Sequence, residues 1–230
     1  MWLYATLMFV ALVLSLVYGL TLVPTVTWAH QAGDSGDLLT AVATGGVPHP
    51  TGYPSYLLLV DAFRWLPWGD LALQQALFSA LCAIATALLV VLLVNALTPV
   101  QGWRAAFAGG FAALWLGFTP LFWSQAVVVE VYSLHALFTA LLWWWAVVLT
   151  PTPTLRKEFR SARPAWRVVL AQQWATPRLA GLTAGLALGN HLTVAASVAA
   201  LLLLLVWRYF AQRLSRGRNA SDGSHPPTPL

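Results

Sequence analysis

The chain has 230 residues, of which 59% are hydrophobic and only 8% are charged. Because a soluble domain carries about one charged residue in four, this composition excludes water as the main solvent of the fold. The net charge of +5 comes from basic residues that lie between and after apolar runs, which excludes a nucleic-acid partner and indicates membrane topology instead. Cys82 is the only cysteine, so an intrachain disulfide is excluded as well.

The first apolar run and the polar segment after it predict a retained membrane helix followed by a shaped loop. Residues 4–22 are long enough to cross a bilayer. A cleavable signal peptide normally has a basic residue before its apolar run, and none precedes this one. Residues 24–54 are rich in Gly, Pro, His, Asp and Thr, which is typical of a loop. Residues 55–68 are apolar but too short to span, so they predict an interfacial helix with Trp65 and Trp68 at headgroup level.

The remaining apolar runs predict an all-α, polytopic transmembrane bundle. Further crossings are expected at residues 71–97, 105–118 and 126–149, and a last apolar stretch covers residues 179–207. Gly181 and Gly185 have the spacing of close helix packing. The predicted division of the chain is a membrane module at 1–207, with an external loop at 23–70 and a cytoplasmic loop at 151–177, and a disordered, basic and Pro-rich cytoplasmic tail at 208–230.

Basic residues orient these crossings, because Lys and Arg near helix ends stay on the cytoplasmic side. Five of them lie in the loop at residues 151–177: Arg156, Lys157, Arg160, Arg163 and Arg167. Counting back from a cytoplasmic loop places the N-terminus inside and the Asp-containing loop outside. A turn at residues 189–191 would return the basic tail to the cytoplasm, which gives about six crossings. We therefore expect a multi-pass membrane protein with its Asp-containing loop on the non-cytoplasmic side. The membrane we expect is a bacterial inner membrane.

The external loop at residues 23–70 carries the residues best suited to chemistry. Asp34 and Asp37 are close enough in sequence to share one site, where a carboxylate can accept a proton from an attacking hydroxyl. The alternative is that both carboxylates only solvate an external turn. The run from His49 to Pro54, with Tyr53, favours a shaped site, since Gly and Pro restrict the loop to particular backbone angles.

Three further polar positions are expected at the same membrane face. Glu130 follows an apolar segment, and an ionisable group close to the bilayer is a functional candidate, although headgroup water would also satisfy it. Asn190 and His191 interrupt the last apolar stretch. His135 lies about one turn beyond Glu130, and we assign it a structural role. No phosphate-cradling glycine loop, zinc-ligand spacing or nucleophile elbow is present in the sequence, so no metal ligand is assigned.

These motifs resemble a known family. The matching residues are Asp34-Ser-Gly-Asp37, Gly46-Val-Pro-His-Pro-Thr-Gly-Tyr-Pro54, Glu130-Val-Tyr132 and Gly185-Leu-Ala-Leu-Gly-Asn-His191. They resemble the bacterial and animal membrane family, formerly of unknown function, that includes the transmembrane protein O-mannosyltransferases and is similar to the GT-C superfamily. The resemblance covers residues 1–207. The chain departs from the usual pattern at Asp37, where the family usually has Glu, and at Thr51, where it usually has Pro.

The resemblance implies an inverting glycosyltransferase that uses a polyprenyl-phosphate sugar, with mannose as the first candidate, and a hydroxyl acceptor on a protein or glycan. It implies that Asp34 is the general base, with Asp37 as its rival, and that His191 lies near the lipid phosphate. The other residues expected to bind donor or substrate are His49, Tyr53, Glu130, Tyr132 and Asn190. A divalent-metal requirement stays open. The alternatives are a non-catalytic protein that binds or transports lipid, and a truncated subunit that needs a partner subunit.

Overall fold

The structure, a computed structural model, describes residues 1–26, 33–67, 69–149 and 175–221. These ranges contain helices and no strand, which confirms the predicted all-α class. In chain order the elements are α1 (Trp2–Thr21), α2 (Ser35–Thr44), α3 (Pro54–Asp61), the 3-10 helix η2 (Ala62–Trp65), α4 (Leu71–Leu97), α5 (Trp103–Gly117), α6 (Pro120–Ala126), α7 (Tyr132–Leu149), α10 (Ala175–Leu188), the 3-10 helix η3 (Leu192–Val194) and α11 (Ala195–Ser221).

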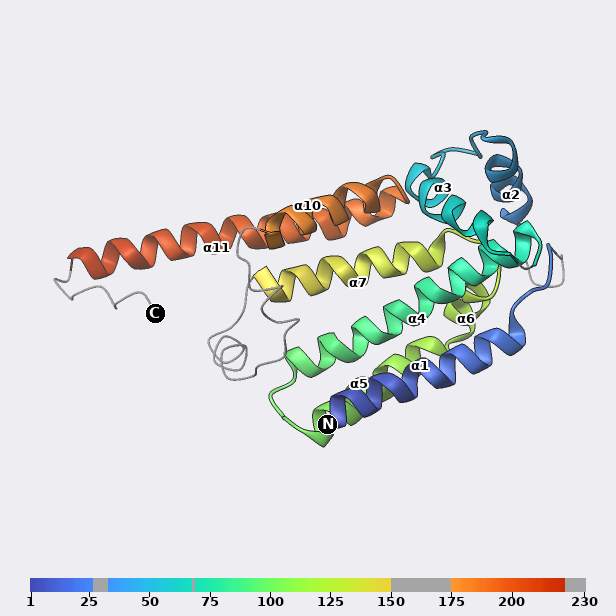
Figure 1. Cartoon of the computed structure of the whole chain (residues 1–230). Helices are drawn as coiled ribbons and strands as arrows, with labels where there is room; N and C mark the ends of the chain where they lie inside the picture. The colour runs from blue at the N-terminus through green and yellow to red at the C-terminus, as the bar shows by residue number, and fades with distance from the viewer. Residues whose placement is uncertain (27–32, 68, 150–174, 222–230) are drawn as a thin grey trace.

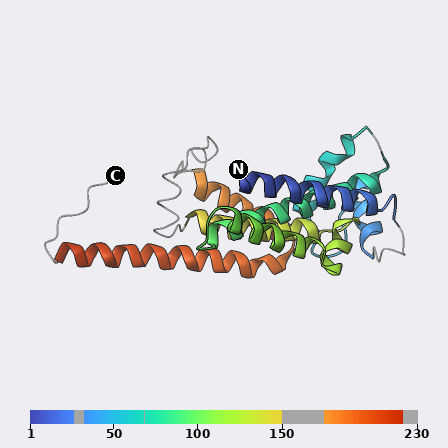
Figure 2. The same ribbon diagram turned by 90° about the horizontal axis from the view of Figure 1, so that it is seen from below.

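The long helices lie side by side and alternate in direction (Figure 1). Helices α1, α5 and α10 run toward the end of the bundle that carries α2 and α3, and α4, α7 and α11 run away from it. The turn between α10 and α11 therefore lies at the same end as α2 and α3, as the break at residues 189–191 predicted. Figure 2 shows α11 along one edge of the bundle, extending past the other helices.

Four described helices are long and apolar enough to cross a membrane: α1, α4, α7 and residues 192–211 of η3 and α11. A fifth span results if α5 and α6, which meet at a bend of 73°, count as one. Helix α10 has 14 described residues, fewer than the roughly 20 that a bilayer core requires. The structure therefore supports four or five spans by length and composition, and it does not confirm six.

The expected external loop contains more helix than its composition predicted. Residues 24–54 were interpreted as loop, but Ser35–Thr44 forms α2, which ends at Gly45 in the left-handed conformation with a φ of 67°. Glycine adopts this conformation without steric cost, so it ends the helix. The predicted helix at residues 55–68 is confirmed as α3 and η2 up to Trp65, and Trp68 lies outside the described residues. Its position at the bilayer interface stays a prediction.

The expected crossing at residues 126–149 is broken at its start. Pro120 begins the short helix α6, which ends at Ala126, and residues 127–131 are not helical. Proline lacks the N–H that a continuing helix needs, which favours a break between α5 and α6. Four valines of this segment are buried, so residues 127–131 form a packed connection at the end of the bundle that carries α2 and α3.

Close packing involves the glycines of α5 rather than those of α10. A Cβ at Gly109 would lie 2.9 Å from the carbonyl oxygen of Val91 on α4, and the hydroxyl of Tyr18 on α1 donates to the carbonyl of Gly117 at 2.8 Å. Within the described chain, a Cβ at Gly181 or Gly185 would meet nothing within 4 Å. The prediction of close packing from their spacing is therefore wrong for the structure described here.

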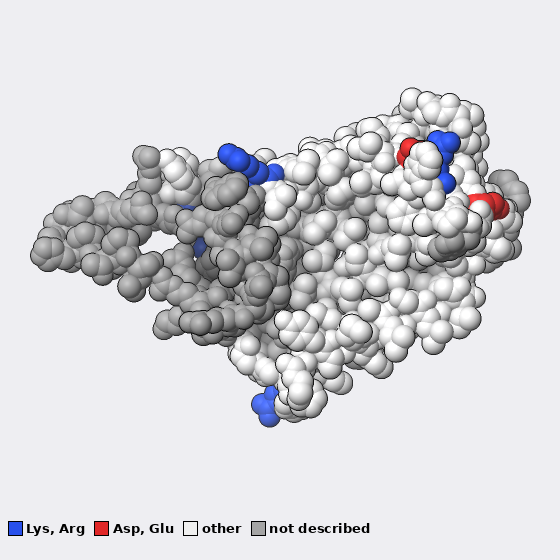
Figure 3. Space-filling view, viewed as in Figure 1, with Lys and Arg blue, Asp and Glu red and all other residues white. Residues whose placement is uncertain are grey.

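Charge is concentrated at the two ends of the bundle (Figure 3). The acidic atoms visible on this face lie at the end with α2 and α3, together with some basic atoms, and an uncharged band separates this end from the basic atoms at the opposite end. Apolar side chains such as Leu12, Phe111 and Leu203 are exposed on the long helices, as expected of a surface that contacts lipid. Most of the expected cytoplasmic loop, residues 151–174, lies outside the described residues. The tail expected to be disordered is helical up to Ser221, and residues 222–230 lie outside the description.

Candidate active site

Asp34 stands at the start of α2, where its position is fixed by the residue that follows it. Ser35 is buried, and its hydroxyl donates to the carbonyl of Val129 at 2.7 Å, which ties the first turn of α2 to the packed segment 127–131. The Asp34 side chain is 49% exposed and makes no capping hydrogen bond to α2. Its carboxylate is therefore held in place by the backbone while its oxygens stay accessible.

Asp37, one helical turn further on, is bound by His49. One oxygen of Asp37, Oδ2, accepts hydrogen bonds from the backbone N–H and from ring Nδ1 of His49, each at 2.8 Å. The other ring nitrogen, Nε2, lies 2.9 Å from the Tyr53 hydroxyl and 3.8 Å from Oδ2 of Asp34. His49 thus links both carboxylates, and the loop from α2 to α3 folds back over the first turn of α2.

The network shifts the pKa values of its members. Hydrogen bonds from the backbone and ring of His49 hold the pKa of Asp37 below its ordinary value of 3.8. The hydrogen bond to Asp37 raises the pKa of His49 above 6.5, burial opposes this shift, and the negative charge of Asp34 adds to it. Both effects favour an ionised Asp37 beside a protonated His49.

Tyr53 joins this network to the turn between α10 and α11. It precedes α3 with a φ of 43°, and its ring is buried. The ring meets His49 edge-on with centroids 5.2 Å apart and stacks on His191 with centroids 6.2 Å apart and planes at 25°. Burial raises the pKa of Tyr53, and the neighbouring ionisable groups Tyr132 and Asp34 raise it further. The hydroxyl therefore stays protonated and available as a hydrogen-bond donor.

His191 lies in a group of aromatic rings from three segments. Besides Tyr53, its ring faces Tyr132 at 5.8 Å and His135 at 5.3 Å between centroids, both from the first turn of α7. Tyr132 is exposed, whereas Asn190 is fully buried and donates from Nδ2 to the carbonyl of Val131 at 3.3 Å. The start of α7 and the α10–α11 turn are therefore joined by both ring contacts and a buried hydrogen bond.

Glu130 lies in the packed segment beneath Asp34. Its side chain is only 5% exposed, and its carboxylate accepts the backbone N–H of Val131 at 3.3 Å. Burial raises the pKa of Glu130 to about 7, the charge of Asp34 adds to the increase, and hydrogen bonds from the backbone N–H groups of Val131 and Asp34 oppose it. Glu130 thus contacts the backbone of Asp34, and the Glu130 carboxyl group loses its proton near neutral pH.

The eight residues predicted for the site therefore gather at one end of the bundle: Asp34, Asp37, His49, Tyr53, Glu130, Tyr132, Asn190 and His191. Their individual roles stay predictions. Two carboxylates and a histidine form one part of this group, and a ring cluster with a second histidine lies beside it. Such an arrangement can accept a proton from one ligand and donate hydrogen bonds to an anionic one.

Comparison with known proteins agrees with this arrangement. The family described as Protein O-mannosyl-transferase TMEM260 N-terminal domain matches residues 34–214, a range that begins at Asp34 and includes all eight residues. The chain belongs to this family. The resemblance predicted from the sequence motifs is thereby confirmed.

Curated relatives of the TMEM260 N-terminal domain family bear the same description. Protein O-mannosyl-transferase TMEM260 of Mus musculus is 37% identical over 112 residues, which cover 48% of this chain and 15% of the mouse protein. Protein O-mannosyl-transferase tmem260 of Dictyostelium discoideum is 26% identical over 152 residues, which cover 63% of this chain and 17% of that protein. The chain therefore matches only about a sixth of the length of either relative. No solved structure matches it.

Two residues of this family member join the site without having been assigned to it from sequence. His135 was expected to be structural, yet its ring faces His191. The hydroxyl of Thr193 lies 2.8 Å from Nδ1 of His191 and 3.4 Å from Nε2 of His135. The position of His135 one turn after Glu130 is a signal for the first, whereas a threonine in an apolar run carries no signal of its own.

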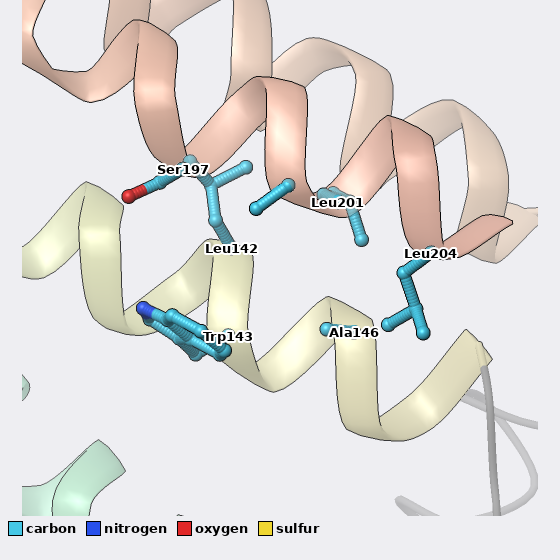
Figure 4. Close-up of a pocket in the computed structure, with 7 residues that line it drawn as sticks. Leu142, Trp143, Ala146, Ser197, Leu201 and Leu204 are labelled. Carbon is cyan, nitrogen blue, oxygen red and sulfur yellow. The ribbon is translucent and has the colours of Figure 1, made fainter.

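Two apolar spaces of the described chain lie away from these polar groups. A gap of about 40 Å³ between α7 and α11 is lined mainly by apolar side chains, among them Leu142, Trp143, Ala146, Ser197, Leu201 and Leu204 (Figure 4). An open groove of about 500 Å³ at the α5–α6 bend is lined by Phe111, Leu114, Trp115, Phe118, Thr119 and Pro120. No predicted site residue lines either space. The described residues contain no group of three or more His, Cys, Asp or Glu side chains arranged for a metal ion.

Proposed function

We propose that this protein transfers a sugar, in the first instance mannose, from a polyprenyl-phosphate donor to a protein hydroxyl on the non-cytoplasmic side of a bacterial inner membrane. The family match and the descriptions of the mouse and Dictyostelium relatives as protein O-mannosyl-transferases support the reaction class. The gathering of carboxylates and histidines at one end of an apolar bundle supports a site at the membrane surface. A donor anchored in lipid would reach such a site without leaving the bilayer.

The observation that carries this proposal is the difference between the two carboxylates of α2. Oδ2 of Asp37 already accepts two hydrogen bonds from His49, and its lowered pKa makes it a weaker base. The carboxylate of Asp34 lies 3.8 Å from Nε2 of His49, a longer contact than either bond to Asp37, and its side chain is half exposed. Asp34 is therefore the better placed general base, and Asp37 acts as a positioning residue that orients His49.

The transfer is a single displacement. Asp34 takes the proton of the acceptor hydroxyl while that oxygen forms a bond to the anomeric carbon of the sugar. The bond from the anomeric carbon to the phosphate oxygen breaks, and the lipid phosphate leaves with its electron pair. His49, protonated beside Asp37, and His191 would stabilise the phosphate by charge or by hydrogen bonding. The attack from the face opposite to the leaving group inverts the configuration of the sugar.

Replacing Asp34 by Asn tests the proposal. Membranes with the wild-type protein should transfer label from a radiolabelled polyprenyl-phosphate mannose to protein, and Asp34→Asn should lower the rate by about 100-fold or more, because a general base contributes that much. Asp61→Asn is the matched control, since Asp61 is an exposed carboxylate at the same end that pairs with Arg64 at 2.9 Å. Transfer that survives in Asp34→Asn would remove Asp34 as the base. Absence of transfer in the wild type would favour a protein that only binds or transports lipid.

A further inference from the structure

The two histidines of the candidate site have opposite surroundings. His49 is held by Asp37 at 2.8 Å and lies 3.8 Å from Asp34, so carboxylates face both of its ring nitrogens. His191 forms no ion pair with a carboxylate in the described part of the chain. The ionisable groups that face its ring are Tyr53, Tyr132 and His135, none of which carries a negative charge at neutral pH.

The backbone of η3 determines which nitrogen of His191 carries the proton. The backbone N–H of Thr193 donates to Nδ1 of His191 at 3.3 Å. A backbone N–H can only donate, so Nδ1 has to be the unprotonated nitrogen. The Thr193 hydroxyl, at 2.8 Å from the same Nδ1, then donates to it as well. Protonation of Nδ1 would set its N–H against the backbone N–H of Thr193, and this backbone hydrogen bond would be lost.

It follows that the single ring proton of His191 lies on Nε2. No described residue accepts a hydrogen bond from this nitrogen. The ring cannot turn freely to find a partner, because Tyr53 stacks against it at 6.2 Å and Tyr132 and His135 pack at 5.8 Å and 5.3 Å. His191 therefore presents a fixed, uncharged N–H donor at the end of the bundle where the lipid-linked donor would bind.

We propose that Thr193 is a positioning residue that holds His191 in the Nε2–H tautomer, so that His191 binds the phosphate of the lipid-linked sugar as a neutral hydrogen-bond donor. This inference rests on the proposed function. It divides the work between the two histidines: His49 supplies positive charge beside the carboxylates, and His191 supplies a directed hydrogen bond. A neutral N–H aimed at the phosphate oxygen stabilises the leaving group without transferring a proton to it.

Paired substitutions at position 191 test which nitrogen is used. The side-chain NH2 of Gln reaches the place of Nε2, whereas the shorter Asn places its NH2 near Nδ1. We expect kcat of His191→Asn to lie about tenfold or more below that of His191→Gln, the size of a lost hydrogen bond to a charged group, because only the Gln amide can donate from the place of Nε2. An equal loss in both variants would overturn the inference, since an imidazolium can be replaced by neither amide.

Substitutions of Thr193 test its positioning role independently. Thr193→Val has the same shape without the hydroxyl, and we expect kcat to fall by about fivefold to tenfold, as for the loss of one hydrogen bond. Thr193→Ser keeps the hydroxyl and should restore kcat. Thr139→Val is the matched control, because among the described residues the Thr139 hydroxyl on α7 bonds only to the carbonyl of His135, within its own helix. Thr193 is exposed, so the valine variant should fold, and its melting temperature is measured alongside.

The outcomes separate this inference from the proposed function. Wild-type membranes that transfer no mannose contradict the proposed function itself. Active wild type together with an unchanged Thr193→Val, or with a Thr193→Ser variant as slow as Thr193→Val, contradicts the positioning role alone. Active wild type with the expected order at positions 191 and 193 supports both.

Discussion

At the scale of single residues, burial determines the protonation of Glu130. Its carboxyl group lies in the packed segment 127–131, where desolvation raises its pKa from 4.5 to about 7. When Glu130 is protonated it adds no charge next to Asp34. When Glu130 is ionised, a second negative charge lies beside the Asp34 carboxylate. The buried acid therefore links the packing of residues 127–131 to the charge around the proposed base.

Replacing Glu130 by Gln should remove a pH dependence of stability. At pH below about 4.5 the carboxyl is protonated in folded and unfolded chains alike, and between about pH 4.5 and 7 only the folded chain keeps the proton. Wild-type stability should therefore fall across this range by on the order of 3 kcal/mol relative to Glu130→Gln, since one pKa unit is worth about 1.4 kcal/mol. Thermal unfolding in detergent between pH 4 and 8 measures it, with Asp61→Asn as control. A difference between Glu130→Gln and wild type that stays constant with pH would contradict the raised pKa.

Individual site residues could be predicted from sequence where polarity itself is informative. Asp34, His49 and His191 stand out in an apolar chain because unsatisfied polar groups are costly near lipid, so they gather where partners exist. The role of Thr193 could not be predicted, since it depends on the direction of one backbone N–H at the start of η3. His135 has an ordinary helical spacing, and only the fold of the α10–α11 turn brings His191 to it.

Among the elements, α5 is the helix whose small residues set the packing. Alanine at Gly109 would place its Cβ 2.9 Å from the Val91 carbonyl oxygen and 3.2 Å from its Cα, which are backbone atoms of α4. We expect Gly109→Ala to lower Tm by about 5 °C, because overpacking costs about 1–3 kcal/mol. Gly181→Ala is the control: a Cβ there meets nothing within 4 Å, so the helix gains propensity without a clash. A Gly181→Ala variant as unstable as Gly109→Ala would contradict the open space that the structure shows at Gly181.

The boundaries of elements followed from sequence where an apolar run is long. A crossing was predicted at residues 71–97, and α4 spans Leu71–Leu97. Its apolar run is long enough to cross a bilayer without any neighbouring segment. Helix α2 was missed, since its four-residue apolar period at Leu38 and Val42 is hidden between glycines that favour loops. The 73° bend between α5 and α6 depends on how the two helices pack onto α4 and α7, which one sequence does not show.

At the scale of the whole molecule, the bundle separates its polar site from its basic end. The acidic atoms in Figure 3 gather where α2 and α3 lie, next to basic atoms of the same end, where Arg64 pairs with Asp61. An uncharged band follows, and the basic atoms beyond it have no acidic atoms beside them on this face. The turn between α4 and α5, which carries Arg104 at the start of α5, lies at the end opposite to α2 and α3 (Figure 1). Since Arg and Lys near helix ends favour the cytoplasm, this charge pattern predicts a non-cytoplasmic site.

Single cysteines at the two ends test this orientation. Val47, between α2 and α3, is 81% exposed, and Gln101 is exposed in the α4–α5 turn. With the buried Cys82 replaced by Ala, a membrane-impermeant maleimide should label Val47→Cys in right-side-out vesicles and Gln101→Cys only in inside-out ones. A Val47→Cys variant labelled from the cytoplasmic side would place Asp34 and His49 there too, because both are tied to the same loop. The acceptor hydroxyl would then have to be cytoplasmic, and the proposed transfer outside the cell membrane would fail even if the polar cluster were catalytic.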